Sequence, residues 1–473
     1  MKKFLSNVSL ISVASAIVIS GCATKLPELA ETDVPSAWQG PMLEGAHVWP
    51  DLNWWSNFNS DELTTVIGQV RSSNLDLANN RRNLRAAQLT LTNAGFDLWP
   101  NPSLTISSSS NRNDVLDDGI DASTTHNNAL SLGLSYNNIL SKPTNYDGAT
   151  AQYDSSVASA VDTVLNTLGT ASSAYFQILL IRDKIVAAQQ NLENAEAIAR
   201  IAQAKVDAGT ATPIDALQQR IAVERQRNNI RNLRQSELSA RASLAVLTGQ
   251  GVQGFDVSGN TLEAIDVPTV QPGLPSELLN RRPDLVQAEA NLRRNRANVD
   301  LARLAFLPNI SLTASGNATS ASLSDILSSP TKTVSATASI VETLLDNGRR
   351  NRDTEQARLN LETALANYRK SVLTAFNEVE ITLSNIALLD ALSTVAAEDL
   401  GRAEEAFRLA QVRYREGVAD YQTVLTAQNT LYDSRNNYLD NKLQRLNSIV
   451  NFYEALGGGW QEGDDAILAE VMK

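Results

Sequence analysis

The stretch NLDLANNRRNLRAAQLTLTNAGFDLWPNPSLT at residues 74–105 occurs again, in altered form, as RPDLVQAEANLRRNRANVDLARLAFLPNISLT at residues 282–313. The two stretches are identical at eleven of 32 positions and align without a gap at an offset of 208 residues. The same offset relates Gly209 to Gly417 and Gly249 to Gly457. One offset that preserves a Pro-Asn pair and two glycines indicates a tandem duplication. We therefore expect two copies of one structural unit.

Long helices are predicted in both copies, because apolar residues recur at alternating spacings of three and four over six to seven heptads. Each long helix ends at a glycine, Gly209 or Gly417, after which the chain turns back as a helical hairpin. At 1.5 Å per residue, each long helix would measure on the order of 100 Å. The predicted long helices are 144–208 and 347–416, the returning helices 213–248 and 420–457, and the short helices 75–98 and 284–306.

Four strands are predicted, two in each copy, between the short and the long helix. Apolar side chains alternate there with serine and threonine, for example at Leu130, Leu132 and Leu134 and again at Ala336, Ala338 and Ile340. Such a period-two pattern is typical of the strands of membrane β-barrels. We expect outward-facing loops near 108–127 and 316–331. Because four strands cannot close a barrel, an open edge in lipid would leave backbone groups unpaired. Three chains would supply twelve strands in a symmetric assembly.

The N-terminus has the pattern of a secretory signal. Lys2 and Lys3 precede an apolar run from Val8 to Ile19, which is too short to span a bilayer. The run ends at Ile19-Ser20-Gly21-Cys22, which resembles a bacterial lipobox. We interpret Cys22 as the lipid-modified first residue of the mature chain. Ala23 follows it, and no aspartate that would resemble an inner-membrane retention signal, so we expect anchoring in the outer membrane.

The composition excludes several classes of function. The chain of 473 residues carries 40 Lys and Arg against 52 Asp and Glu, a net charge of −12, which argues against nucleic-acid binding. It contains two histidines, His47 and His126, and one cysteine. This leaves too few ligands for a metal site of the Cys/His type. We expect no catalytic residues, no metal and no cofactor.

Several motifs resemble the TolC-type outer-membrane factors, in the lipoprotein branch that serves multidrug efflux systems (NodT-like, with pumps of the RND type). The most specific is PGLPSELLNRRPDL at 272–285, which opens the second copy. Others are Trp54-Trp55, Asp61-Glu62-Leu63, Leu345-Asp346-Asn347-Gly348-Arg349 and the stretch 414–428. The resemblance covers residues 22–460. It implies an α+β membrane channel, in which a homotrimer forms a transmembrane β-barrel continuous with a long α-helical barrel that extends into the periplasm. It also implies a periplasmic adaptor and an inner-membrane pump as partners.

The hairpin turns are the candidate functional positions. Turn-forming residues that we also expect to meet the adaptor are Gly209, Thr212, Pro213, Gly417, Asp420 and Tyr421. By resemblance, the periplasmic end is closed by an apolar and an acidic residue just after the second glycine, and the matching positions here are Gln422 and Thr426. A Gln/Thr ring would favour cations less, and respond to pH less, than an acidic ring.

The predicted domain organisation is a signal peptide at 1–21, an anchor and extended segment at 22–60, repeat 1 at 61–271, repeat 2 at 272–457 and a mobile tail at 458–473. We interpret the protein as a passive exit duct for drugs or other toxic small molecules. Two alternatives remain open at this stage. The first is an exit duct for type I protein secretion. The second is a lipid-anchored coiled-coil scaffold without a pore, which the four matched strands oppose.

Overall fold

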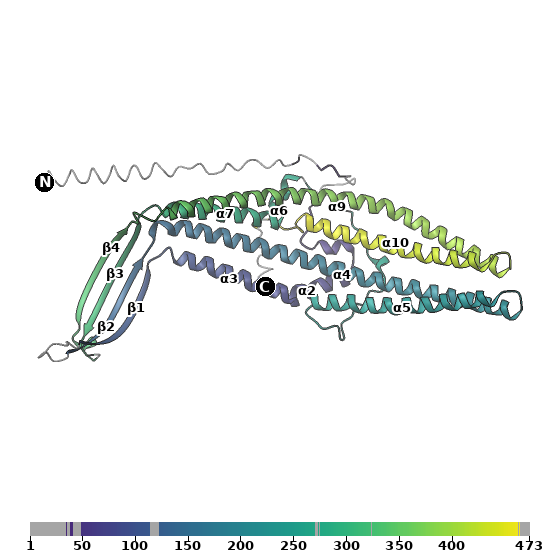
Figure 1. The fold of residues 1–473 in the computed structure, drawn as a ribbon, viewed down its shortest axis with the longest axis horizontal. Helices are drawn as coiled ribbons and strands as arrows, with labels where there is room; N and C mark the ends of the chain where they lie inside the picture. Colours follow the sequence, from purple (N-terminus) through teal and green to yellow (C-terminus); the bar gives the residue numbers. More distant parts are fainter. Residues whose placement is uncertain are drawn as a thin grey trace. The chain divides into compact units, whose positions relative to one another are not determined.

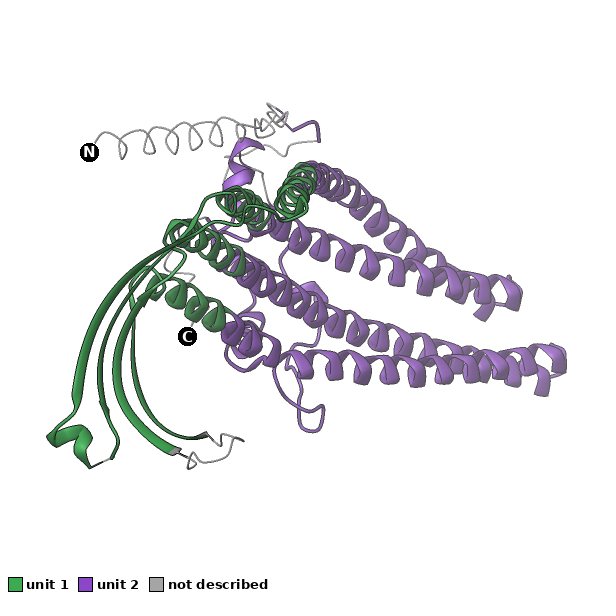
Figure 2. Ribbon diagram, turned by 60° about the vertical axis from the view of Figure 1, so that its left-hand side comes forward, with its two compact units in different colours: residues 1–31, 84–156, 287–369 green, residues 32–83, 157–286, 370–473 purple. Residues whose placement is uncertain are grey.

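The computed structural model describes residues 35, 38–40, 49–113, 123–269, 273, 275–322, 324–461 and 463. The chain divides into two compact units (Figure 2). Unit 1 comprises residues 1–31, 84–156 and 287–369, and unit 2 comprises residues 32–83, 157–286 and 370–473. The predicted signal peptide at 1–21 and Cys22, the predicted lipid-modified residue, lie outside the described residues.

The predicted helices are present, and each end lies within two residues of the predicted position (Figure 1). The long helices are α4 (Lys142–Asp207) and α9 (Arg349–Arg415), and the returning helices are α5 (Pro213–Leu247) and α10 (Tyr421–Ala455). The short helices are α3 (Leu75–Phe96) and α7 (Pro283–Leu304). Smaller helical elements are η1 (Trp54–Phe58), α2 (Asp61–Ser73), η2 (Ile139–Ser141), η3 (Leu262–Ala264), η4 (Pro275–Glu277), α6 (Leu278–Arg281) and α8 (Asp325–Ser328).

Unit 1 contains one antiparallel sheet in the order β1-β2-β3-β4, which bends as a single curved layer in Figure 2. Its strands are β1 (Asn101–Asn113), β2 (Ser123–Tyr136), β3 (Asn309–Ser320) and β4 (Thr331–Val341). The prediction of outward loops at 108–127 and 316–331 was wrong in extent. Serines, threonines and asparagines there continue the strands, because ladder pairing satisfies their backbone whatever side chain they carry. Barrel strands also extend beyond the apolar band.

The core of unit 2 is aromatic. Trp54 is fully buried, and its ring centroid lies 5.2 Å from that of Tyr453. Phe58 lies beneath it, 5.1 Å from Phe176 of α4. Aromatic pairs at such distances contribute about 0.5–1.5 kcal/mol beyond the area that they bury. Trp54 and Phe58 therefore hold η1 against α10 and α4.

The segment that follows α5 and contains Asp256 and Gly259 is held by polar contacts within unit 2. The Arg182 guanidinium on α4 contacts the carboxylates of Glu237 and Asp256, at 3.1 and 2.5 Å. The Glu62 carboxylate accepts hydrogen bonds from the backbone of Gly259 and the hydroxyl of Tyr175, at 2.8 and 2.9 Å. These contacts fix the segment beside α4, so that the second copy starts from a defined position.

Candidate functional site

The two hairpin turns have the same backbone geometry. Gly209 has φ = 72° and Gly417 has φ = 77°, the left-handed conformation that ends a helix. In the first turn Thr210 N donates to Lys205 O at 2.8 Å, and in the second Val418 N donates to Arg413 O at 2.8 Å. A Cβ at either glycine would meet nothing within 4 Å. The turn conformation alone, and not space, therefore requires glycine there.

The residues that start the returning helices have exchanged roles between the copies. At α5, Thr212 precedes the helix and donates from Oγ1 to Asp215 Oδ2 at 3.0 Å. At α10 the acid comes first, and Asp420 Oδ1 accepts from Thr423 N and Thr423 Oγ1, at 2.9 and 2.6 Å. These two hydrogen bonds, first that of the hydroxyl, hold the pKa of Asp420 below its ordinary value. Both arrangements cap a helix start and place a carboxylate at its positive end.

Tyr421 connects the two hairpins. Its hydroxyl donates to Gln219 Oε1 of α5 at 2.5 Å, and Gln219 Nε2 donates to Ala195 O of α4 at 2.8 Å. Tyr421 is 7% exposed and Gln219 is fully buried. Burial, together with the nearby Tyr414 and Asp215, raises the pKa of the Tyr421 hydroxyl. Tyr421 therefore does not offer its side chain to a partner in this conformation, unlike the exposed turn residues.

A second link lies beside the first. Lys205 Nζ donates to Tyr414 O at 2.9 Å and lies 4.0 Å from the centroid of the Tyr414 ring. Tyr414 and Tyr421 belong to one buried apolar cluster with Ile198, Phe407 and Val424. The hairpins thus share a small core close to their turns, in agreement with their adjacent positions in Figures 1 and 2.

Gln422 and Thr426 lie on the opposite face of α10. Both are exposed and one helical turn apart, whereas Tyr421 and Val424 are buried. Their counterparts 208 residues earlier are Ile214, which is 63% exposed, and Gln218. Among the described residues, neither of these faces is packed against another element. The second copy presents glutamine and threonine where the first presents isoleucine and glutamine.

Of the predicted turn residues, Tyr421 is the one whose side chain contacts the other hairpin. Gly209, Thr212, Pro213, Gly417 and Asp420 are exposed. The residues that sequence reasoning missed are Gln219, Lys205 and the buried pair Asn191 and Gln428, in which Gln428 Nε2 donates to Asn191 Oδ1 at 2.7 Å. A glutamine at a seam position, as Gln219 is between Ala216 and Val223, was the available signal.

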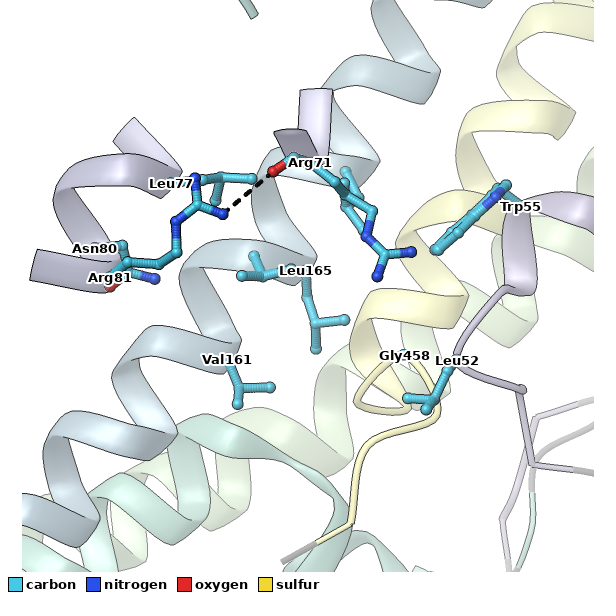
Figure 3. Close-up of a pocket in the computed structure, with 11 residues that line it drawn as sticks. Leu52, Trp55, Arg71, Leu77, Asn80, Arg81, Val161, Leu165 and Gly458 are labelled. Carbon is cyan, nitrogen blue, oxygen red and sulfur yellow. Dashed lines mark hydrogen bonds between the residues drawn. The ribbon is translucent and has the colours of Figure 1, made fainter. Parts of the chain in front are cut away.

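The described residues hold no cluster of three or more His, Cys, Asp and Glu side chains suited to a metal ion. A small cavity in unit 2 is lined mainly by Leu52, Trp55, Leu77 and Leu165 (Figure 3). At its edge Arg81 donates to the backbone carbonyl of Arg71. Its volume is about 60 Å³, whereas pockets for drug-sized ligands measure about 300–1,000 Å³. It has room for water only.

Comparison with known proteins gives consistent matches. The family model described as "Outer membrane efflux protein" matches residues 66–250 and 274–458, two stretches that start 208 residues apart. The pyoverdine export outer membrane protein OpmQ of Pseudomonas putida is 31% identical over 454 residues, covering 94% of this chain and 96% of the relative. The toluene efflux pump outer membrane protein TtgC of Pseudomonas putida is 28% identical over 474 residues, covering 96% of each chain.

Solved structures share the fold. The outer-membrane channel OprN has a TM-score of 0.81 at 23% identity, covering 92% of this chain and 100% of that one. The Campylobacter jejuni CmeC outer membrane channel has a TM-score of 0.85 at 21% identity, covering 95% and 97%.

Proposed function

We propose that this chain, which belongs to the outer membrane efflux protein family, is a passive exit duct for toxic small molecules and performs no catalysis. We also propose that Gln422 and Thr426 close its periplasmic end. The family membership itself makes the chain the outer-membrane exit channel of a tripartite efflux system. It works as a trimer that extends into the periplasm, with a periplasmic adaptor and an inner-membrane pump.

The observation that carries the duct is the four-stranded sheet. Its apolar face is exposed at Leu104, Ile106, Leu132 and Ile340, each between 62% and 70%. Within the described strands, β1 and β4 each have one neighbour and form the two edges of the sheet. An exposed apolar face suits lipid, but open edges do not, since each unpaired backbone group there costs several kcal/mol. Closure with two further chains satisfies both conditions.

The long helices support the same assembly. The spans 139–207 and 349–415 each contain an 18-residue window apolar enough for a membrane span by length and composition alone. In the first the window is 61% buried, but in the second it is only 17% buried. The exposed stripe of α9 runs through Leu373, Ile381, Leu388, Leu392 and Val395. Neighbouring chains of the trimer would cover it.

The cargo is proposed from the relatives. The relative TtgC is a toluene efflux pump outer membrane protein, and ArpC of Pseudomonas putida is an antibiotic efflux pump outer membrane protein, 28% identical over 474 residues. Both names concern small molecules and not secreted proteins. We propose that the exposed turn residues Gly209, Thr212, Pro213, Gly417 and Asp420 meet the adaptor, and that Tyr421 joins the hairpins instead. Cys22 remains the proposed lipid attachment site.

The experiment for the duct is conductance of the purified full-length chain in planar bilayers, with the oligomer mass measured in parallel. A trimer that conducts, or that conducts once its closed end is loosened, is the expected result. A monomer that inserts but never conducts would return the chain to the scaffold interpretation. Labelling with radioactive palmitate, lost in Cys22→Ser, tests the anchor separately.

The placement of the gate is tested by charge. Thr426→Asp would put three carboxylates around a narrow opening, and we expect the permeability ratio of cations to anions to rise severalfold and to fall again on acidification below about pH 4. Gln218→Asp adds the same charge at the equivalent exposed position of the first hairpin and is the matched control. Equal effects of the two variants, or none from Thr426→Asp, would show that the constriction lies elsewhere.

A further inference from the structure

The sheet has two edges that must each meet another chain. Strand β1 forms one edge and strand β4 the other, and all three pairings inside the chain are antiparallel. In a closed trimer the β4 edge therefore faces β1 of the partner subunit. This inference rests on the proposed function, because it takes the closed trimer as given. What the single chain leaves open is the register, that is, which residue of β4 lies opposite which residue of the partner.

The duplication allows this register to be inferred from a pairing that the chain already contains. In the first copy Pro102 of β1 lies opposite Leu134 of β2, and in the second copy Ile310 of β3 lies opposite Ile340 of β4. Pro102 and Ile310 are 208 residues apart, so they are counterparts. Ile340 is therefore the second-copy counterpart of Leu134. By the direct offset, Ile106 is the first-copy counterpart of Ala314.

The junction between copies occurs inside the chain as well as between chains. Strand β2 of the first copy pairs with β3 of the second, and there Leu134 lies opposite Ala314. In a closed barrel the staggers between successive hairpins must sum to the fixed shear of the barrel. A trimer has six hairpins, two from each chain, and if they are equivalent each junction contributes the same stagger. We propose that β4 pairs with β1 of the partner subunit in the register that puts Ile340 opposite Ile106 of the partner subunit. The same transfer puts Ala336 opposite Ser110 of the partner subunit.

In this register the paired side chains lie on the same face of the sheet. Ile106 and Ile340 are each 70% exposed on the apolar face, to which Leu134 also belongs. A slip by one residue would set Ile340 against Thr105 or Ser107, whose side chains point to the other face. A slip by two residues keeps the faces and sets Ile340 against Leu104 or Ser108. Only the repeat selects among these, and the choice determines the tilt of the strands and the bore of the barrel.

Cysteine cross-linking measures the register. Opposite residues have Cβ atoms about 4.5–5.5 Å apart and diagonal ones about 7–8 Å apart, whereas a disulfide needs about 3.5–4.5 Å. We would compare Ile340→Cys combined with Ile106→Cys, with Leu104→Cys and with Ser108→Cys, in the full chain under mild oxidation. Each single variant reports any background from Cys22, the one native cysteine.

We expect the Ile106 pair to give a covalent trimer on a non-reducing denaturing gel, and the other two pairs at least about fivefold less. Faster cross-linking at Leu104 or Ser108 would overturn the register. The pair Ala336→Cys with Ser110→Cys repeats the test at a distance of four residues. If neither expected pair cross-links although native mass measurement shows a trimer, the pairing of β4 with β1 is wrong. Absence of any trimer would instead overturn the proposed duct.

Discussion

The joint at which a returning helix ends beside a short helix is built once in each copy, and the two joints differ in their side chains but not in their backbone. In the first, a Cβ placed on Gly249 would lie 2.3 Å from Ser73 O, and in the second, a Cβ on Gly457 would lie 1.9 Å from Arg281 O. Both glycines have positive φ, 71° and 84°. The four residues form two pairs of counterparts at the 208-residue offset. The close approach of the two backbone segments therefore predates the divergence of the copies.

In the first joint one neutral side chain performs two tasks. Asn74 is 2% exposed, and its Nδ2 donates to Leu247 O at 2.8 Å. Its Oδ1 accepts from Leu77 N at 2.9 Å, which caps the start of α3.

In the second joint the two tasks are divided between charged residues. Arg282, 8% exposed, donates to Ala455 O at 3.1 Å, the counterpart of the Leu247 carbonyl. Asp284 accepts from Leu285 N at 3.0 Å. Arg282 also contacts the carboxylates of Asp284 and Glu378, at 2.8 and 2.7 Å, and these ion pairs raise its pKa against the opposing effect of burial. The charged version therefore also binds α9, which the neutral version has no means to do.

The carbonyl at the end of the returning helix and the glycine beside it are therefore the fixed requirements of this joint. The donor that satisfies the carbonyl was free to change. The second copy used that freedom to add ion pairs, and with them a dependence on charge that the first copy lacks.

The largest effect is expected from the glycines. In Gly457→Ala the new Cβ meets a backbone oxygen that cannot move aside, and we expect a loss of about 3 kcal/mol or more in the free energy of unfolding. Gly249→Ala should cost slightly less. Gly417→Ala has the same positive φ but open space around it, and should cost about 1 kcal/mol. Thermal denaturation in detergent, followed by circular dichroism, ranks the three, and equal losses would mean that the close approach is unimportant.

Arg282→Met should come next, at about 2–3 kcal/mol, because it leaves two carboxylates without their counter-charge and the Ala455 carbonyl without a donor. Adding Glu378→Gln to that variant should restore part of the loss, whereas Glu378→Gln alone should destabilise. This double-mutant cycle isolates the ion pair. The comparison of the two joints would fail if Glu378→Gln had the same effect in both backgrounds.

The smallest effect depends on pH. Glu454 replaces the exposed Val246 of the first copy and lies against the α4 backbone at Gly169, where a Cβ would be only 1.7 Å from its Oε1. Burial, and then the charge of Asp162, raises the pKa of Glu454 to about 7. Burial also raises the pKa of Asp162, which faces Asp284, Arg282 and Glu378.

Between the ordinary value of 4.5 and about 7, the folded chain binds more protons at Glu454 than the unfolded chain does. The free energy of unfolding should therefore fall as the pH rises through that window, and then level off. Glu454→Gln should remove most of the slope and stabilise the chain by about 1–2 kcal/mol at pH 8 but little at pH 5. Denaturation at the two pH values measures this. Val246→Gln is the matched control and should leave the slope unchanged.

Much of the fold could be predicted, because its signals are local. Heptad spacing and the glycines at 209 and 417 located the helices, and the 208-residue offset showed that the elements come in matched sets. The strands were placed correctly but drawn too short. Ser107 to Arg112 carry no apolar alternation, and only pairing with a neighbouring strand identifies them as extended chain.

The site was less predictable, since it depends on contacts between distant parts of the chain. The turn residues could be identified from their own sequence. The local sequence does not reveal that the partner of the buried Tyr421 is Gln219, 202 residues earlier, while Gln422 beside it is exposed. Arg282 donates to the carbonyl of Ala455 at the end of α10 and also forms ion pairs, and the first of these roles is visible only once α10 is in place.

The two glycine joints also have a consequence for the order of folding. Gly249 meets Ser73 and Gly457 meets Arg281, so each of these two joints closes within its own copy. All the parts of the first closure are available once about 250 residues have emerged during export, while the second copy is still being delivered. The closed first copy then offers a finished surface on which the second assembles. A duplicated chain of this length can in this way fold in two successive steps, each with its own loop to close.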